Sequence, residues 1–208
     1  MQPPVRPRRY RLGRRQATVD RTRARILKAA RAVLVARGGA EFSIDAVARR
    51  ARVTRPTVYQ QFGSRPKLLE ALFDDLAREG GMWSLGDAFR RPDPNDALKE
   101  FVATFGRFWT VHRRILRRLI ALGGLDTALD RTLRARQEWR RPGLRTIVAR
   151  MRERYGKPAD AEDETVDLLF TLTSFETFDM LAGAKRTPAQ VAPLVLRAAR
   201  AILRLTAA

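Results

Sequence analysis

The sequence lacks cysteine and contains a single histidine, His112, among its 208 residues. The absence of cysteine excludes disulfide frameworks, thiol nucleophiles and cysteine-based zinc sites, and one histidine is too few for nearly every histidine-based catalytic scheme. The one conceivable catalytic cluster would combine His112 with Glu176 and Asp179, and their spacing fits no acid, base or metal mechanism. We therefore expect a protein that is not an enzyme and that uses no metal or cofactor.

Long apolar runs are also absent from the sequence. No uninterrupted run reaches the roughly 18 residues that are needed to span a bilayer. The N-terminus is basic but lacks the apolar stretch of a signal peptide. These two absences predict a soluble, cytoplasmic protein that has no membrane partner.

Acidic residues are scarce relative to basic ones, with 22 Asp and Glu against 42 Lys and Arg, for a net charge of +20. Such a balance favours a polyanionic partner such as nucleic acid. Residues 1–63 hold 16 basic and 3 acidic residues, a net charge of +13, whereas residues 64–208 hold 26 and 19, a net charge of +7. This distribution indicates a basic N-terminal module followed by a more nearly balanced body.

The first 15 residues contain three prolines, six arginines and few apolar side chains. This composition predicts a flexible basic arm over residues 1–19. The arm is either a solvated tail or a segment that follows DNA phosphates or enters a minor groove.

Apolar residues at helical spacing predict four successive helices in the N-terminal part of the chain. Ser43, Thr54 and Ser64 are suited to cap three of them, and glycines at 38–39, 63 and 80–81 end helices. The predicted helices cover residues 20–37, 43–52, 54–62 and 64–79.

The rest of the chain continues in the same pattern, without period-two alternation and without an internal repeat. The sequence Thr187-Pro188-Ala189-Gln190 has the form of a capping box at the start of the last helix, and Pro142 should kink or break a long helix. We expect an all-α protein whose body contains helices at 93–109, 113–122, 126–155, 161–184 and from 187 onward.

The helices predicted at 43–52 and 54–62 are short and are joined by a tight turn at Arg52-Val53, which is typical of a helix-turn-helix. The second helix of this motif enters the major groove of DNA, where side chains of its first turn reach base edges. Thr54, Arg55 and Thr57 supply two hydroxyl groups and a guanidinium there. Tyr59 and Gln60 also lie off the inner face of the helix.

The segment from Arg21 to Phe73 resembles the TetR family of transcriptional regulators. The family pattern of an apolar-Tyr pair, two polar residues, Phe, Gly and Ser-Lys before a Leu-rich helix has its counterpart in Val58-Tyr59-Gln60-Gln61-Phe62-Gly63-Ser64-Arg65. Arg52 stands where the family usually has glycine, and Gln60-Gln61 replaces a common aromatic-His pair. The resemblance implies a three-helix DNA-binding domain at 20–63 and a helical ligand-binding and dimerisation domain at 64–208, connected through the helix at 64–79.

The resemblance also implies roles for individual side chains. Arg55 and Thr57 would read bases, and Tyr59 and Gln60 would contact phosphate. Each residue could instead be a helix cap or a solvated charge. The complete set of candidate DNA-binding residues is Ser43, Thr54, Arg55, Thr57, Tyr59, Gln60 and Arg65, with Thr22 and Arg23 as weaker candidates.

Proteins of the family pair through their last two long helices and hold an inducer among the middle ones. Glu176 would orient a cationic or hydrogen-bond-donating ligand, or would instead be a buried acid paired with an arginine. The aromatic residues at helical spacing would line a pocket among the middle helices, but such a stripe is more often core than pocket. His112 is expected to be solvated or to lie at a helix end, and Arg113 is expected to face mostly solvent. The candidate ligand-binding residues are Phe105, Phe108, Trp109, Leu116, Trp139 and Glu176.

The hypothesis that follows is a homodimeric repressor that binds an inverted-repeat operator in double-stranded DNA. A small, largely apolar ligand would release it from the operator. The alternative is a constitutive architectural DNA-binding protein without an inducer, which the basic charge would also permit.

Overall fold

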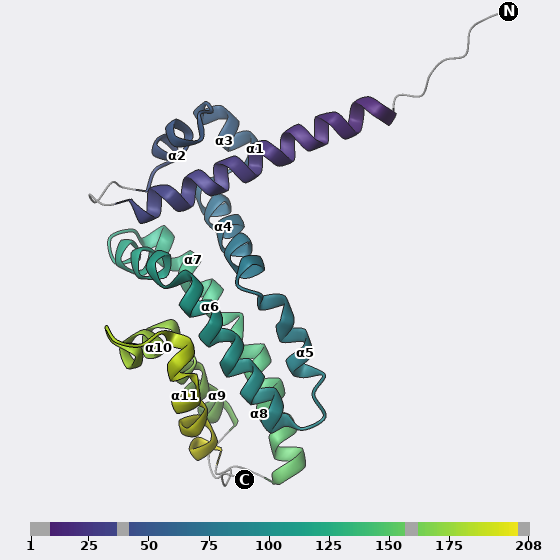
Figure 1. Ribbon diagram of the computed structural model, residues 1–208, viewed down its shortest axis with the longest axis vertical. Helices are drawn as coiled ribbons and strands as arrows, with labels where there is room; N and C mark the ends of the chain where they lie inside the picture. Colours follow the sequence, from purple (N-terminus) through teal and green to yellow (C-terminus); the bar gives the residue numbers. More distant parts are fainter. Residues whose placement is uncertain (1–8, 37–41, 157–161, 204–208) are drawn as a thin grey trace, which may run out of the picture. The chain divides into compact units, whose positions relative to one another are not determined.

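The computed structural model describes residues 9–36, 42–156 and 162–203, and every regular element within these ranges is a helix (Figure 1). This confirms the expected all-α fold class. The chain divides into two compact units, Met1–Phe73 and Asp74–Ala208, which are described separately. The boundary between them falls within the helix at 65–79, whereas we expected the body to begin at residue 64. No helix in the described part of the chain is both long and apolar enough to cross a membrane.

The N-terminal unit contains α1 (Arg9–Val35), α2 (Ile44–Ala51), α3 (Arg55–Phe62) and the first residues of α4 (Arg65–Glu79). Helix α1 packs against α2 and α3. The apolar side chains that recur at helical spacing are buried, so the predicted apolar faces of these helices meet in one small core. Its members include Ile26, Ala30, Leu34, Val47, Ala48, Val58, Phe62 and Leu68.

The predicted caps of this unit are confirmed. The Ser43 hydroxyl accepts a hydrogen bond from the backbone N–H of Ala46 at 3.2 Å, and the Thr54 hydroxyl accepts one from Thr57 at 3.3 Å. The Ser64 hydroxyl accepts one from Lys67 at 3.3 Å before α4. Each hydroxyl satisfies a backbone donor that the first turn of a helix leaves without an intrahelical partner.

The expected flexible arm is wrong over residues 9–19, because α1 begins at Arg9 rather than at residue 20. The three prolines that suggested an irregular arm all precede Arg9. The residues that follow them, including Arg, Leu, Gln and Ala, have high helix propensity, so the helix extends toward the N-terminus without needing a packed apolar face. Residues 1–8 of the arm and the glycine stop expected at 38–39 lie outside the described residues.

The C-terminal unit is built around α6 (Pro94–Gly123), a helix of 30 residues that packs against α5, α7, α8, α10 and α11. Asp93 caps α6, accepting from the N–H of Asn95 at 2.8 Å. The remaining elements of the unit are η1 (Met82–Ser84), α5 (Leu85–Phe89), α7 (Thr127–Glu138), α8 (Arg140–Tyr155), α9 (Glu162–Leu172), α10 (Phe175–Ala182) and α11 (Pro188–Ile202).

The two helices that we expected at 93–109 and 113–122 are one continuous helix. The residues between them include neither glycine nor proline, so nothing in the sequence interrupts α6. His112 is therefore not at a helix end. It is 1% exposed and its ring packs on Phe108, with ring centroids 4.9 Å apart. Gly80 permits this packing, because a Cβ there would lie 2.3 Å from Cδ2 of Phe108.

The helix expected at 126–155 is broken at Trp139, between α7 and α8. Pro142 explains the position of the break, because a proline ring clashes with the carbonyl four residues earlier, here that of Glu138. This confirms the expected kink or break. Pro142 itself lies in the first turn of α8, where proline is tolerated.

The helix expected at 161–184 is wrong as a single element, because it divides into α9 and α10 at residues 173–174. Ser174 caps α10 by accepting from the N–H of Thr177 at 3.1 Å. The carbonyl of Thr173 leaves the helical pattern and accepts hydrogen bonds from Nε1 of Trp109 at 3.3 Å and Nη1 of Arg140 at 2.7 Å. Tertiary donors therefore satisfy the carbonyl that the break exposes.

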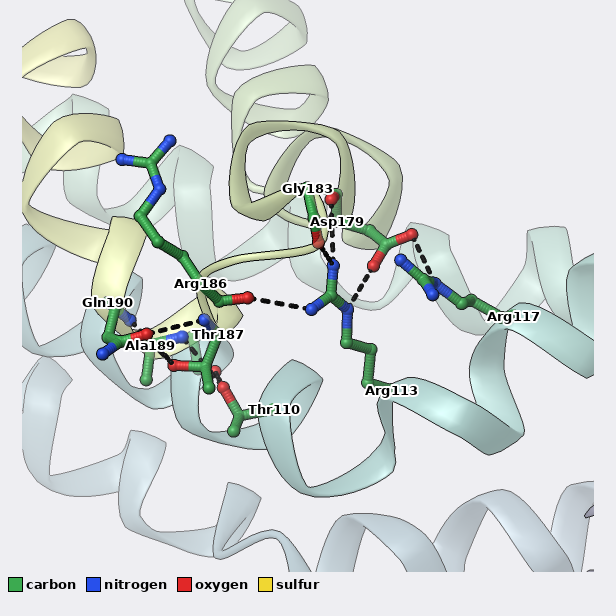
Figure 2. A network of polar contacts seen from close by, with 10 residues as sticks. Thr110, Arg113, Arg117, Asp179, Gly183, Arg186, Thr187, Ala189 and Gln190 are labelled. Atoms are coloured by element: carbon green, nitrogen blue, oxygen red, sulfur yellow. Dashed lines mark hydrogen bonds and ion pairs between the residues drawn. The ribbon is translucent and has the colours of Figure 1, made fainter.

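The capping box of the last helix is confirmed, since the Thr187 and Gln190 side chains each accept from the other residue's backbone N–H. Figure 2 shows how the link before this helix is held. Arg113 on α6 donates to the carbonyls of Arg186 at 2.9 Å and Gly183 at 2.6 Å, and to the Asp179 carboxylate. The expectation that Arg113 faces solvent is therefore wrong. Its side chain is only 19% exposed.

The Asp179 carboxylate is the acidic centre of this network, accepting from Nε of Arg113 and, at 2.8 Å, from Nε of Arg117 (Figure 2). Burial disfavours the charged form of Asp179, but the hydrogen bonds from Arg117 and Arg113 outweigh it and lower the pKa of this carboxyl below its usual value. The carboxylate joins α10 to α6.

Replacing Asp179 by asparagine should lower the free energy of unfolding at pH 7 by about 1–3 kcal/mol, the usual cost of losing hydrogen bonds to a charged group. The native pKa lies below the unfolded value. The stabilisation is therefore present above the unfolded pKa of about 3.9 and is lost as the pH falls through the native pKa. Urea unfolding should show the difference between wild type and Asp179→Asn shrinking between about pH 5 and pH 3.

The matched control is Asp163→Asn. Asp163 pairs with Arg145 at 2.9 Å, but its side chain is 81% exposed. Its loss should change stability by less than about 1 kcal/mol at either pH. If the free energy of unfolding of Asp179→Asn stayed below that of the wild type by the same amount down to about pH 3, the assigned role of the carboxylate would be contradicted.

Arg52, in the turn between α2 and α3, is the one non-glycine residue with positive φ in the described ranges, at φ 52° and ψ 49°. Arg52→Gly should raise the free energy of unfolding by roughly 0.5–1 kcal/mol, because glycine adopts this conformation without a Cβ clash. Arg50→Gly makes the same charge change inside α2 and should instead lower stability by about 1 kcal/mol. Urea unfolding of both variants measures these changes in the free energy of unfolding. A loss of stability in Arg52→Gly would refute the claim that the left-handed conformation strains the backbone at Arg52.

Candidate functional site

The helix-turn-helix is formed by α2, the turn at Arg52 and α3. The backbone N–H of Arg52 donates to the carbonyl of Arg49 at 3.2 Å, and the N–H of Val53 donates to that of Ala48 at 3.1 Å. These bonds close a tight turn between the two helices. The turn lets Val58 and Phe62 of α3 join the core, at 1% and 6% exposure.

Outside the buried Val58 and Phe62, α3 carries mostly exposed polar side chains. Arg55, Tyr59 and Gln60 are exposed, and Thr57 is half-buried. The exposure of Tyr59 and Gln60 agrees with the expectation that they lie off the inner face. The structure thus leaves most of the candidate DNA-binding residues of this helix accessible.

Arg55 is held in place by two side chains. Its Nη1 lies 3.3 Å from Oδ2 of Asp45, and its Nη2 donates to Oη of Tyr59 at 3.4 Å. The hydrogen bond that Arg55 donates to Tyr59, followed by the charge of Asp45, raises the pKa of the Arg55 guanidinium above its usual value. Because the side chain remains 57% exposed, the guanidinium is oriented and still accessible to a partner.

The hydroxyl groups at the start of α3 serve first as caps. The hydroxyl oxygens of Thr54 and Thr57 are 2.8 Å apart, and that of Thr54 also accepts from the backbone of Thr57. Ser43 caps α2 in the same way. A capping hydroxyl retains acceptor and donor capacity, so these residues remain candidates for phosphate contacts.

Arg65 and Arg23 brace the N-terminal unit. Arg65 donates from Nε to the carbonyl of Phe42 at 3.0 Å, with its guanidinium over the Phe42 ring. Arg23 donates from Nη1 to the carbonyl of Gln61 at 3.0 Å, and its guanidinium lies 4.4 Å from the centroid of Phe62. Both side chains are therefore tied to the fold, which the sequence did not indicate. Thr22 is half-buried on α1.

Further exposed cations were not among the expected site residues. Arg49 and Arg50 end α2, Arg52 forms the turn, and Lys67 lies in the first turn of α4. The run of basic residues at the end of α2 could have indicated them. They add accessible positive charge to the helix-turn-helix.

The structure brings together four of the six candidate ligand-binding residues. Phe105, Phe108, Trp109 and Leu116 lie on the buried face of α6. The Trp109 ring contacts those of Phe105 and Phe108, with centroids 5.4 and 4.9 Å apart, and it also meets Phe175 of α10 at 5.7 Å. These rings form an aromatic core in the C-terminal unit.

Trp139 and Glu176 do not belong to this core, so the structure does not bring them together with the other four candidates. Trp139, at the break between α7 and α8, is 70% exposed, with the Arg136 guanidinium 3.9 Å from its ring centroid. Glu176 is exposed on α10 and accepts from Nε2 of Gln137 at 3.3 Å. The helix breaks at Trp139 and Ser174 change which side chains face inward. The continuous helices that were expected at 126–155 and 161–184 do not predict this change.

The ionisable residue that does reach the aromatic core is Arg140, which the sequence did not single out. It is 4% exposed. Its guanidinium lies 4.4 Å from the ring centroid of Phe170 and 5.8 Å from those of Phe105 and Trp109. Burial lowers the pKa of Arg140 to about 10, so the group remains protonated at neutral pH.

The sequence of the N-terminal unit matches a known protein family. Residues 26–72 match the model of the bacterial regulatory proteins of the tetR family. No curated protein matches the sequence significantly.

Solved structures resemble the chain over most of its length. A TetR-like transcriptional regulator from Rhodococcus sp. RHA1 is 21% identical, with a TM-score of 0.58 over 87% of this chain and 95% of that one. A protein described as a fatty acid metabolism regulator from Clostridium perfringens is 18% identical, with a TM-score of 0.63 over 88% and 99% of the two chains.

The transcriptional regulator FadR from Bacillus subtilis, in complex with stearoyl-CoA, is 15% identical, with a TM-score of 0.62 over 84% of this chain and 95% of that one. At these identities the likeness establishes the fold. Residues 26–72, which contain the helix-turn-helix, therefore match the tetR family of bacterial regulatory proteins, and the chain as a whole shares the fold of these solved regulators.

Proposed function

We propose that the protein is a sequence-specific DNA-binding transcriptional repressor that acts as a homodimer and leaves its operator when a small molecule binds in the C-terminal unit. The observation that carries this proposal is the exposed face of α3. There, Arg55 is oriented by Asp45 and Tyr59 at the start of a helix that is held in a helix-turn-helix.

The geometry of α3 suits the major groove, which admits one α-helix. A guanidinium in the first turn of the recognition helix can donate two hydrogen bonds to the O6 and N7 atoms of guanine. Arg55 already has its rotamer restricted by Asp45 and Tyr59, so it loses less side-chain entropy on binding than a free arginine does. We assign base reading to Arg55 and Thr57.

Phosphate contacts would come from groups beside the reading residues. We assign these contacts to Ser43, Thr54, Tyr59, Gln60 and Arg65, where hydroxyl, amide and guanidinium groups can donate to phosphate oxygens. The net charge of +13 over residues 1–63 adds a sequence-independent attraction to DNA. Residues 1–8 of the basic arm would contribute to this attraction.

Ligand control requires a site whose occupancy differs between two conformations of the protein. The aromatic core on α6 is the best-suited part of the chain, because it offers apolar rings and one buried cation. FadR from Bacillus subtilis, a protein of this fold, was solved in complex with stearoyl-CoA. This supports the proposal that the C-terminal unit binds a small molecule with a large apolar part.

Dimerisation would use α9, α10 and α11, the helices at the C-terminal end of the described chain. Leu168 of α9 and Met180 of α10 are apolar yet 49% and 77% exposed. Burial of such side chains against a second copy is the usual way to remove apolar surface from water. A dimer would place two recognition helices on an inverted repeat.

The base-reading assignment is tested with Arg55→Ala. The substitution should reduce discrimination between an operator selected from a random duplex library and a scrambled duplex by about 1–3 kcal/mol, because one specific base contact is lost. Fluorescence anisotropy with both duplexes measures this difference.

Lys67→Ala is the matched control, since it removes one exposed cation from the same unit. It should weaken binding to both duplexes alike and reduce the salt slope by about 1. If Arg55→Ala also weakens both duplexes equally, Arg55 does not read bases. If the wild type does not discriminate between the duplexes at all, the architectural alternative is favoured.

The dimer is tested with Met180→Glu. A buried charge at the interface should shift the protein from dimer to monomer at micromolar concentration and reduce operator affinity by about 10²-fold or more, because the two half-sites lose their linkage. Sedimentation velocity measures the first effect and anisotropy the second. Leu125→Glu, at a side chain that is 89% exposed outside these helices, should remain dimeric. A monomeric wild type would refute the proposed assembly.

A further inference from the structure

Arg140 is buried with part of its hydrogen-bonding capacity unused. Its Nη1 donates to the carbonyl of Thr173 at 2.7 Å and its Nε to that of Gln137 at 3.4 Å. Its Nη2 is inaccessible to solvent and has no hydrogen-bond partner. An unsatisfied buried donor on a charged group is costly, and native structures rarely retain one without a reason.

The positive charge of Arg140 also lacks a buried counter-charge. No carboxylate in the described ranges forms an ion pair with it. The acids whose charge it senses are Glu176 and Glu138. Glu176 is exposed and accepts from Gln137, and Glu138 pairs with Arg141 at 2.6 Å. The cation is therefore compensated mainly by ring faces and by carbonyl dipoles.

We propose that Nη2 of Arg140 binds the carboxylate of the small molecule that controls this protein, and that this molecule is a monocarboxylic acid with an apolar body. The inference rests on the proposed ligand response and specifies the chemistry of its ligand. The rings of Phe105, Trp109 and Phe170 would contact the apolar body while the guanidinium neutralises the acid.

A single negative charge matches the donors that remain. Nε1 of Trp109 already donates to the carbonyl of Thr173. The Thr173 hydroxyl donates to the backbone carbonyl of Leu169 at 2.8 Å. Of the nitrogens of Arg140, Nη2 has no partner, and it offers two N–H groups. A dianionic phosphate needs more donors than this to offset its loss of water, whereas a carboxylate is satisfied by fewer.

Phe170 gives the ligand a route to this group. Of the three rings that pack on the Arg140 guanidinium, Phe170 alone is half-exposed, whereas Phe105 and Trp109 are 4% and 7% exposed. Phe170 also stacks on Arg141, 4.1 Å from its ring centroid. A rotamer change of this one ring would open the aromatic core to solvent without unfolding a helix.

The experiment compares two acids with their neutral amides: 2-naphthoate with 2-naphthamide, and decanoate with decanamide. Calorimetric titration of the wild-type protein should give at least one acid a Kd about tenfold or more below that of its amide, because the buried cation favours the charged form. The preference should be lost in Arg140→Met and retained in Arg141→Met, which removes the adjacent, surface-paired arginine.

A protein with a net charge of +20 could also attract acids to its surface. Binding at a buried pair should change little between about 0.05 and 0.5 M NaCl, whereas surface binding should weaken strongly. The proposal is overturned if every amide binds as tightly as its acid, if the preference disappears at high salt, or if Arg141→Met abolishes it. The first two readouts use the wild type alone, so they decide the matter even if Arg140→Met does not fold.

Operator binding separates this inference from the proposed function. An acid that binds through Arg140 but leaves operator affinity unchanged would refute the ligand-controlled repressor while supporting the site. Release of DNA by an amide as readily as by its acid would support the repressor and refute the site.

Discussion

The carbonyl of Thr173 is the point on which the C-terminal unit depends most directly. It stands at the break between α9 and α10 and accepts from Trp109 of α6 and Arg140 of α8, so one backbone oxygen joins four helices. A buried carbonyl without partners would cost about 1–3 kcal/mol. The two donors remove that cost and fix where the chain bends. The same contact places the Arg140 guanidinium among aromatic rings.

Helix α6 connects this point to the other end of α10. Its buried face carries Trp109, and about one turn further along Arg113 holds the link between α10 and α11 through Asp179 and two carbonyls (Figure 2). An anion at Nη2 of Arg140 would be held by the same guanidinium whose Nη1 donates to the Thr173 carbonyl. Because α10 is attached to α6 at both sites, a shift at one of them changes the packing at the other. This is a physical route from ligand binding to the helices proposed for the dimer.

The local features of the fold could be predicted from the sequence, and the tertiary ones could not. The caps at Ser43, Thr54 and Thr187 depend on contacts within three residues, and their sequence pattern identifies them. The bend at Thr173 depends on donors 33 and 64 residues away, and no local pattern carries that information. Arginine is almost never fully buried, so the residue type alone gave no reason to single out Arg140. The neighbouring Trp139 is the opposite case, since it was expected among the ligand-binding residues and is exposed.

The candidate DNA-binding residues were easier to predict because they follow a motif of fixed spacing. The number of basic residues, however, is larger than the number of cations that can contact DNA phosphates. Arg23 and Arg65 are tied to backbone carbonyls of their own unit, and Arg55 is shared with Asp45 and Tyr59. In the C-terminal unit, Arg113 and Arg140 are bound to internal carbonyls. Part of the positive charge therefore stabilises the fold. The salt dependence of DNA binding should reflect the smaller number of accessible cations on the helix-turn-helix and the arm, since only phosphates neutralised by the protein release counterions.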